Sequence, residues 1–425
     1  MIEKEERRKI ITDWWPEKGQ MTLAEYLERG GFSVLGKALA GEISPDDAIA
    51  ELDESGLQGR GGGGFKTGLK WRLAREETRK ARPPKNSDIA QAYFICNADE
   101  SEPGTYKDRI IVEKCPYLVL EGVLLGAWAA GANKGFVYVN GSYQDTAHIL
   151  RQAIANLLQA GWLGKAIQNG NFDFDLEVFE GAGSYVCGEE TALLNSIEGK
   201  RGEPRLRPPF PAQKGLFGRP TLINNVETLA CVPYILGKGA GSFKMLGRSE
   251  FSFGTKLFVL NGALNQPGVY EAPLGVTVRE LIEDYGRGIP AGKTLKCVQV
   301  GGDSGSLYAV DEIDKPLGYG REAEISVGSG AVLVIDNQTD IKKLLLSWSR
   351  FFRRESCGKC VPCREGTYQL LLLAERIAKG MTLKGDRERL EDIILTMREA
   401  SFCAFGSYAV NPWESALRLF SKEIF

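Results

Sequence analysis

Residues 92–109 read AYFICNADESEPGTYKDR, an apolar run that ends at Cys96 and is followed at once by a cluster of carboxylates. Short apolar runs rich in β-branched and aromatic residues are typical of buried strands. Two further runs, GFVYVN at 135–140 and LEVFEGAG at 176–183, alternate with helical stretches such as 147–158. This alternation predicts an α/β domain with a largely parallel sheet, because parallel strands need a crossover helix between them.

The carboxyl ends of two predicted strands carry polar clusters. NADESEPGTYKDR at 97–109 directly follows the first strand, and EGAGSYVCGEET at 180–191 joins a later strand to a helix through glycines and carboxylates. A run of acidic residues is usually a solvated surface. Open α/β sheets bind ligands at the carboxyl ends of their strands, so the repeated placement favours hydrogen bonds to a cofactor or its ribose.

A third segment, GRGGGGFKTGLKW at 59–71, contains four consecutive glycines between an arginine and a phenylalanine. A backbone without side chains can turn its amides toward a phosphate or lie flat against a ring. The segment matches neither the GxGxxG nor the GxxxxGK[ST] fingerprint of nucleotide-binding loops. It favours a ligand-binding loop of another type, with a plain flexible turn as the alternative.

The rest of the sequence predicts two further domains. Between 251 and 336 the short strands KLFVLNG, NQPGVYEAP, LKCVQVGG and GAVLVID surround one helix at 277–285, which indicates a mixed sheet gripping a helix. From Thr339 onward helical periodicity covers 340–353, 365–379, 387–400 and 412–420. In the polar opening section, Ser44 and Pro45 followed by two aspartates predict a helix start. We therefore expect an N-terminal segment plus α/β domain at 1–246, a compact α+β domain at 247–336 and a helical bundle at 337–425.

Nine cysteines without an export signal argue against a disulfide framework. Cys357, Cys360 and Cys363 have CxxCxxC spacing in SCGKCVPCREG, and we expect them in a loop because neither Gly358 nor Pro362 continues a helix. Three clustered thiolates and a remote fourth commonly hold a [4Fe-4S] cluster, and the remote cysteine here is Cys403. Structural zinc, which usually draws on two CxxC pairs, is the alternative. We expect the single cysteines to be small buried hydrophobes: Cys96, Cys115, Cys187, Cys231 and Cys297.

Composition and length exclude several classes of function. The formal net charge is −2, with 53 basic and 55 acidic side chains, so we expect no nucleic-acid partner. The N-terminus MIEKEERRKI does not resemble a signal peptide, and the apolar stretch 117–132 is short and interrupted by Glu121. We therefore expect a cytoplasmic chain with a buried helix at 117–132 and no direct membrane insertion. The one histidine, His148, is expected to be a surface or packing residue, which leaves no hydrolytic triad.

Five motifs in order resemble the NADH- and FMN-binding F subunits of respiratory complex I, NADH-quinone oxidoreductase, over nearly the whole chain: GRGGGGFKTGLKW, NADESEPGTYKDR, GAGSYVCGEETAL, PRLRPPFPAQKGLFGRPTLINNVETL and SCGKCVPCREG. The resemblance implies a Rossmann-like FMN and NADH domain, a ubiquitin-like β-grasp domain of the soluble-ligand-binding type (SLBB) and a helical bundle holding a [4Fe-4S] cluster. It also implies hydride transfer from NADH to FMN and single-electron transfer to the cluster. No catalytic side chain is expected, because the cofactors carry this chemistry.

The resemblance also assigns residues. Those expected around FMN are Gly59, Gly61, Lys70, Asn97, Asp99, Glu100, Gly188, Glu189, Glu190, Asn224, Asn225 and Thr228. Those expected around NADH are Phe65, Glu102, Tyr185, Glu190, Arg207 and Phe210. Phe65 and Phe210 would stack on NADH, and Glu190 at a ribose would repel the 2′-phosphate of NADPH. The chain departs from the family where Gly63 and Lys66 replace alanine and proline, and where Arg207 replaces a common lysine.

The implied partners are a small thioredoxin-like subunit with a [2Fe-2S] centre and the other peripheral-arm subunits of complex I. They would place the chain on the cytoplasmic face of a membrane. One alternative is the diaphorase subunit of a soluble NAD-linked hydrogenase or formate dehydrogenase, which shares these motifs, although many such relatives carry an extra thioredoxin-like or ferredoxin domain in the same chain. An alternative from another class is a zinc-stabilised, non-redox binding protein built on the β-grasp domain.

Overall fold

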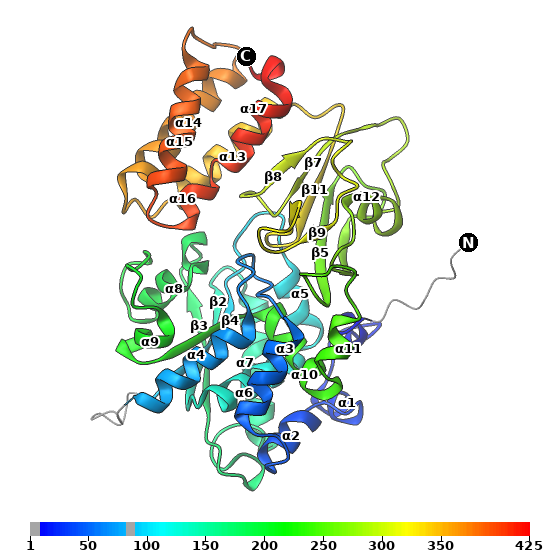
Figure 1. Cartoon of the computed structure of the whole chain (residues 1–425), viewed down its shortest axis with the longest axis vertical. Coiled ribbons are helices and arrows are strands. Elements are labelled where there is room, and N and C mark those ends of the chain that lie inside the picture. The colour runs from blue at the N-terminus through cyan, green and yellow to red at the C-terminus, as the bar shows by residue number, and fades with distance from the viewer. Residues whose placement is uncertain (1–8, 82–89) are drawn as a thin grey trace.

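The computed structural model describes residues 9–81 and 90–425, so most of the charged N-terminus used to judge export lies outside the described residues. Figure 1 shows a helix-covered sheet in the lower half of the molecule, with a second sheet and a bundle of helices above it. The chain builds these three parts in sequence order, as the colour from blue to red shows.

A four-stranded sheet forms the centre of the lower part. All its neighbouring strands are parallel, in the order β3-β2-β1-β4. The strands are β1 (Tyr93–Ala98), β2 (Lys134–Asn140), β3 (Asp175–Gly181) and β4 (Thr221–Asn225). The predicted parallel sheet is therefore confirmed, and all four carboxyl ends lie at one edge.

Helices cover both faces of this parallel sheet. The α-helices are α1 (Leu23–Glu28), α2 (Ser33–Leu39), α3 (Pro45–Ser55), α4 (Thr67–Lys80), α5 (Lys107–Lys114), α6 (Pro116–Ala130), α7 (Gln144–Gln159), α8 (Glu190–Ile197), α9 (Pro211–Lys214), α10 (Val226–Lys238) and α11 (Ala240–Lys244). Short 3₁₀ segments are η1 (Thr12–Trp14), η2 (Ile167–Asn169), η3 (Tyr185–Gly188) and η4 (Leu216–Gly218). Helix α3 begins where Ser44 and Pro45 predicted it, because Ser44 and Asp47 bond reciprocally to each other's backbone amides.

The apolar stretch at 117–132 is the buried helix α6, as predicted. Its one carboxylate, Glu121, accepts hydrogen bonds from the Tyr26 hydroxyl at 2.5 Å and the Phe32 amide at 2.9 Å. Burial raises the pKa of Glu121. None of the helices within 9–81 and 90–425 is long and apolar enough to cross a bilayer.

A mixed sheet follows, with strand order β6-β5-β11-β7-β8 and a small separate pair, β9 and β10. The strands are β5 (Thr255–Gly262), β6 (Gly268–Pro273), β7 (Leu295–Val300), β8 (Ser306–Tyr308), β9 (Leu317–Gly318), β10 (Ile325–Ser326) and β11 (Ala331–Asp336). The helix expected at 277–285 is a short α-helical turn, α12 (Val278–Glu280), that continues as a π-helical turn, η5 (Leu281–Tyr285). One helix held by a mixed sheet is the β-grasp arrangement that the resemblance implied.

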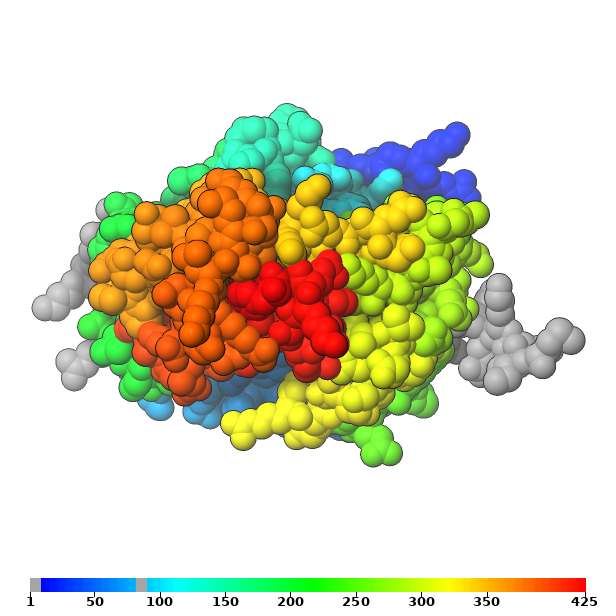
Figure 2. All heavy atoms as spheres, turned by 90° about the horizontal axis from the view of Figure 1, so that it is seen from above, coloured from blue at the N-terminus to red at the C-terminus, as the bar shows by residue number. Residues whose placement is uncertain are grey.

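The C-terminal bundle contains α13 (Ile341–Glu355), α14 (Val361–Ala378), α15 (Asp386–Ala400), α16 (Ala404–Tyr408) and α17 (Asn411–Ile424). Its core includes Trp348, Leu370, Met397 and Trp413. Seen from above in Figure 2, the orange and red bundle lies beside the yellow and green mixed sheet. Hydrogen bonds from the Leu307 amide to Ser415 and from Asn411 to the Ser304 carbonyl, at 2.9 and 2.8 Å, join the two parts.

Replacing Tyr26 with phenylalanine should destabilise the fold by about 1–2 kcal/mol, because the buried Glu121 carboxylate loses its hydroxyl donor. The midpoint of urea unfolding measures this loss. Tyr408→Phe is the matched control, since Tyr408 is 56% exposed. Equal midpoints for the two variants would contradict the role of the Tyr26 hydroxyl.

Candidate functional site

The carboxyl edge of the parallel sheet brings three of the predicted motifs together. Strand register places Asn97 of β1 opposite Asn225 of β4. The Asn97 side-chain amide donates to the Gly188 carbonyl at 2.9 Å, which holds the segment before α8 over the end of β1. Residues from 97–109, 180–191 and 221–228 therefore line one region.

The glycine-rich loop lies between the two sheets. Its ends are closed by a hydrogen bond from the Gly59 amide to the Phe65 carbonyl at 2.9 Å. A Cβ atom on Gly61 would lie 3.0 Å from the Cβ of Asn225, and one on Gly64, where φ is +61°, would lie 3.0 Å from the Tyr319 ring. Glycine is thus favoured by close approach of the protein on both sides, so the loop is packed rather than a plain flexible turn.

The two departures from the family in this loop cause no conflict in space. A Cβ atom on Gly63 would meet nothing within 4 Å, so an alanine fits there. Lys66 precedes α4 with a φ of −62°, the value that proline would impose. The loop conformation is therefore compatible with either sequence.

Two buried carboxylate oxygens beside the loop have no hydrogen-bond donor. Asp99 is 1% exposed, and its Oδ1 is unpartnered while Ser101 donates to Oδ2. Glu189 Oε2 accepts from the Thr191 and Ala192 amides at the start of α8, both at 2.9 Å, while its Oε1 has no hydrogen-bond donor and pairs with Arg207 Nη1 at 3.7 Å. Buried acceptors without donors are costly, so a ligand rich in hydroxyl or N–H donors fits here, as the ribityl chain and ring of FMN would. Burial raises the pKa of Asp99 to about 7.

Residues expected at FMN and at NADH meet in one ionic group. The Glu190 carboxylate pairs with Lys70 Nζ at 2.9 Å and with Arg207 Nη1 at 3.2 Å. Burial alone would raise the pKa of Glu190, but the two cations outweigh burial and hold the pKa below its ordinary value. The exposed aromatic residues Phe65 and Phe210 keep 53% and 52% of their surfaces in solvent, which leaves both rings free to stack on a ligand.

Glu102 joins the parallel-sheet part to the mixed-sheet part. Its Oε1 accepts from the Ser304 amide at 3.2 Å, the Ser304 hydroxyl at 3.0 Å and the Tyr185 hydroxyl at 3.4 Å. The Tyr185 amide donates to Glu355 of the bundle at 2.9 Å, so all three parts meet at Tyr185. Burial raises the pKa of both Glu102 and Tyr185. No local pattern pointed to Ser304, which lies 202 residues from Glu102.

Three other predicted flavin residues use their side chains within the protein. Glu100 accepts from the Asp108 and Arg109 amides, both at 2.9 Å, and so caps α5. Thr228 is fully buried and accepts from the Arg60 amide at 2.9 Å, while Asn224 accepts from Trp71 Nε1 at 2.9 Å. These contacts hold the loop and helices in place, and direct contacts of the three residues with FMN stay predictions.

The cysteine segment differs from its predicted conformation. Helix α14 begins at Val361, so Cys360 precedes the helix and Cys363 lies in its first turn. The expectation of a loop through Pro362 and Cys363 was wrong, because proline is tolerated in the first turn, where no intrahelical donor is needed. Gly358 does lie in the loop, with φ at +74°.

The remote cysteine lies beside the clustered three. The Phe402 amide, directly before Cys403, donates to Cys360 Sγ at 3.5 Å. Burial, reinforced by Cys360, Cys403 and Cys357, raises the pKa of Cys363 to about 12. Across 9–81 and 90–425, no three His, Cys, Asp or Glu side chains are close enough to bind one metal ion. Four neighbouring thiols are the ligand set of a [4Fe-4S] cluster, in which each thiolate binds a different iron.

The remaining single cysteines and the histidine behave as predicted. Cys96, Cys115, Cys187, Cys231 and Cys297 are all buried free thiols. His148 lies on α7 and is exposed. None of these side chains is part of the site.

The connecting segment 199–210, between α8 and α9, touches both halves of the site. Its Arg207 forms an ion pair with Glu190. Its Pro204 carbonyl accepts a hydrogen bond from Lys359 Nζ at 2.6 Å. A recess of about 270 Å³ lies between this segment and the cluster loop, where Phe402 and Cys403 form its wall.

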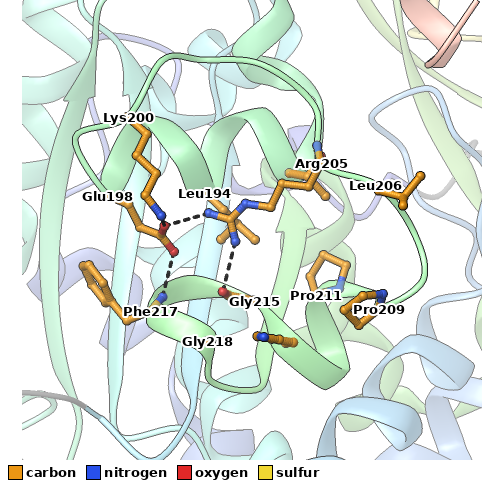
Figure 3. A pocket seen from close by; sticks show the side chains of 12 residues that line it. Leu194, Glu198, Lys200, Arg205, Leu206, Pro209, Pro211, Gly215, Phe217 and Gly218 are labelled. Atoms are coloured by element: carbon orange, nitrogen blue, oxygen red, sulfur yellow. Dashed lines mark hydrogen bonds and ion pairs between the residues drawn. The ribbon is translucent and has the colours of Figure 1, made fainter.

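A cavity of about 530 Å³ lies between α8, the connecting segment and residues 211–218. Figure 3 shows the Glu198 carboxylate there between Lys200, Arg205 and the Phe217 amide. The single charge of Glu198 is shared by Lys200 and Arg205, so this group keeps a net positive charge. None of the residues predicted to contact FMN or NADH lines it.

Comparison with known proteins agrees with this geometry. Residues 52–234 match the family described as the Nuo51 FMN-binding domain, and residues 343–425 match the NADH-ubiquinone oxidoreductase-F iron-sulfur binding region. Fold, loop and thiol set thus define a flavin-binding and iron-sulfur-binding oxidoreductase subunit.

Full-length relatives specify the family. The F subunit of NADH-quinone oxidoreductase from Aquifex aeolicus is 42% identical over 95% of this chain and 90% of its own length. The corresponding F subunit of Mycobacterium tuberculosis is 43% identical over 97% of this chain and 92% of its own length. The chain belongs to the family of NADH-quinone oxidoreductase F subunits. Among solved structures, a chain of an NAD⁺-reducing [NiFe]-hydrogenase superposes with a TM-score of 0.83 at 37% identity, covering 97% of this chain and 68% of the other.

Flavin affinity should rise with pH around 7. The buried Asp99 carboxyl has a raised pKa of about 7, and hydrogen bonds from ligand hydroxyls favour its ionised form. Binding is therefore weaker below this pKa and stronger above it. Fluorescence titration of flavin-free protein with riboflavin, which has no phosphate to titrate, measures the effect. A pH dependence that persists in Asp99→Asn would exclude Asp99 as its source.

Cys403→Ala should abolish the iron-sulfur cluster while leaving bound flavin in place, because the cluster loses one of four ligands and the flavin region is separate. Iron, sulfide and flavin analysis of the purified variant measures this. Cys115→Ala, which removes a buried thiol elsewhere, is the control. Four irons retained in Cys403→Ala would refute the ligand assignment.

Proposed function

We propose that this chain oxidises NADH at a bound FMN and passes the electrons singly to a [4Fe-4S] cluster, as the electron-input subunit of a multi-subunit NADH-quinone oxidoreductase. FMN accepts a hydride as two electrons and releases electrons one at a time, which suits it to join these two kinds of carrier. The observation that carries the proposal is the buried Asp99 Oδ1 at the carboxyl edge of the sheet, which has no hydrogen-bond donor, in one fold with four neighbouring thiols.

NADH is positioned in this proposal by the residues at the Glu190 ionic group. Glu190 accepts hydrogen bonds from the ribose hydroxyls, and its lowered pKa keeps the carboxylate ionised for this role. Lys70 and Arg207, which pair with Glu190 in the ligand-free fold, then become free to bind the phosphates. Phe65 and Phe210 stack on the rings. Glu102 and Tyr185 close the nicotinamide end, where their shared hydrogen bond and the burial of Glu102 limit the access of water.

FMN is held by backbone and by hydrogen-bond acceptors. The backbone from Gly59 to Gly64 carries only one side chain, and a Cβ atom on Gly63 would meet nothing within 4 Å, so a flat ring or a phosphate can approach it. Asn97, Asp99 and Glu189 supply the polar contacts. Direct hydride transfer needs no protein acid or base. What the side chains contribute is alignment and a dry environment.

Cys357, Cys360, Cys363 and Cys403 are the proposed cluster ligands. We place the parts at 1–246 for FMN and NADH, 247–336 for the β-grasp and 337–425 for the cluster. The proposed partners are a thioredoxin-like [2Fe-2S] subunit and other subunits of a peripheral arm. That arm would stand on the cytoplasmic face of the membrane.

Anaerobic purification followed by absorption spectra tests the function. Iron, sulfide and flavin analysis should find one FMN and one [4Fe-4S] cluster, and NADH should bleach the flavin absorbance. Zinc without flavin, or no bleaching after careful reconstitution, would reject the proposal.

A second candidate is the diaphorase subunit of a soluble NAD⁺-reducing hydrogenase, which the structural match favours. The chemistry within this chain would be the same. Co-purified partners discriminate the two, because quinone reductase activity accompanies one assembly and hydrogen-dependent NAD⁺ reduction the other.

Glu190→Gln should raise the kcat/KM ratio of NADPH to NADH roughly tenfold, because the charge that repels a 2′-phosphate is removed while Lys70 and Arg207 remain. Steady-state rates with ferricyanide as acceptor measure the ratio. Glu198→Gln, at the other end of α8, is the matched control. An unchanged ratio in Glu190→Gln would show that this carboxylate does not face the ribose.

A further inference from the structure

A group of buried charges lies where the parallel-sheet part meets the mixed sheet. Glu227 of α10 is fully buried and pairs with Lys256 of β5 at 2.6 Å and with Lys107 of α5 at 3.0 Å. Lys107 also pairs with Asp108 at 2.6 Å, and no member of this group is more than 4% exposed. We call Lys107, Asp108, Glu227 and Lys256 the junction cluster.

The junction cluster touches the glycine loop through one residue. Asp108 Oδ2 accepts from Asn225 Nδ2 at 2.5 Å, and the Asn225 side chain is the group that packs against Gly61. Asn225 and Glu227 both belong to the start of α10, so the same helical turn carries the loop contact and the central carboxylate. In Figure 1, α5 and α10 lie below β5.

A contribution to folding stability alone explains the junction cluster poorly. Burying an ion costs several kcal/mol, and apolar residues of similar volume often stabilise a protein as well as a buried ion pair does. Charges in a low-dielectric interior, however, act on a neighbouring group over longer distances than surface charges do. Such charges influence any electron-accepting group held nearby.

Further charged and titratable groups surround the junction cluster. Glu100 accepts from the Asp108 amide, and Arg60 packs on Tyr319 with its guanidinium 5.6 Å from the ring. Glu271 faces the region from β6, where Thr255 donates to it at 2.6 Å, and Cys231 lies on α10. The cations are Arg60, Lys107 and Lys256, and the carboxylates are Glu100, Asp108, Glu227 and Glu271.

We propose that the junction cluster is an electrostatic positioning unit for the flavin, which sets the flavin midpoint potential through Asn225 and the glycine loop. The inference deepens the proposed function and rests on it. Removing a cation leaves excess negative charge behind the loop, which disfavours adding electrons to the flavin and lowers its potential. Removing an anion has the opposite effect.

Titration of Lys256 adds a pH signature. Burial lowers the pKa of Lys256 to about 8, although Glu227 opposes that shift. Above this pKa the cluster gains net negative charge. The flavin potential of the native chain should therefore fall more steeply between pH 7 and pH 9 than that of a variant without the lysine.

The experiment is an equilibrium redox titration of the full chain loaded with FMN, followed by flavin absorbance. Lys256→Met should shift the midpoint potential downward and Glu227→Gln should shift it upward. The double variant Glu227→Gln/Lys256→Met leaves no unpaired charge at that pair and should return toward the native value. Arg279→Gln removes an exposed cation from α12 and should leave the potential unchanged.

Opposite shifts from the two single variants, with FMN dissociation constants within about tenfold of the native one, support the proposal. If the cluster had only a structural role, both variants would bind FMN more weakly, and the midpoint potential would stay unchanged or shift in the same direction in both. That result would overturn the proposal. If a single variant does not fold, the steeper pH slope of the native chain against the double variant decides. Failure of the native chain itself to bind FMN would instead reject the proposed function.

Discussion

The buried carboxylate of Glu227 is the interaction on which the relative placement of the two sheets depends. It accepts from Lys256 and from the Leu257 amide, both on β5, while Lys107 approaches it from α5. An unpaired charge at this depth would cost several kcal/mol, so α10 and β5 are held in one relative position. The glycine loop fits between α10 and Tyr319, so the close contacts of Gly61 and Gly64 depend on the fixed position of α10 relative to β5.

The second consequence is that one continuous site draws on three parts of the chain. Tyr185 bonds to Glu355 through its amide and to Glu102 through its hydroxyl, and its ring contacts Phe351 and Phe405 of the bundle. The bundle that carries the thiols is thereby packed directly on the segment leading into α8. The proposed flavin site and the proposed cluster ligands therefore belong to parts of the chain that pack directly on each other.

Local patterns in the sequence predicted the strands, the buried helix α6 and the start of α3, because apolar periodicity and capping residues act within a few positions. They failed at Pro362, where proline in a first helical turn looks the same in sequence as proline in a loop. They also missed Ser304 and the junction cluster. These contacts join residues far apart in the chain, and only the topology of the two sheets brings them together. The residues assigned to FMN and NADH came from resemblance, and their ligand contacts stay predictions.

A zinc-stabilised binding protein would leave the interior of this molecule unexplained. Asp99 and Glu189 each keep one buried oxygen without a donor, at a cost of about 1–3 kcal/mol for each group. Replacing either side chain with an apolar one would remove that cost, whereas a metal bound by the four thiols would supply no hydrogen-bond donor to these oxygens. A ligand with several hydroxyl groups does remove it, at the place where a side-chain-free loop leaves room. The proposed function accounts for this cost, because a hydroxyl-rich cofactor would supply the missing hydrogen-bond donors.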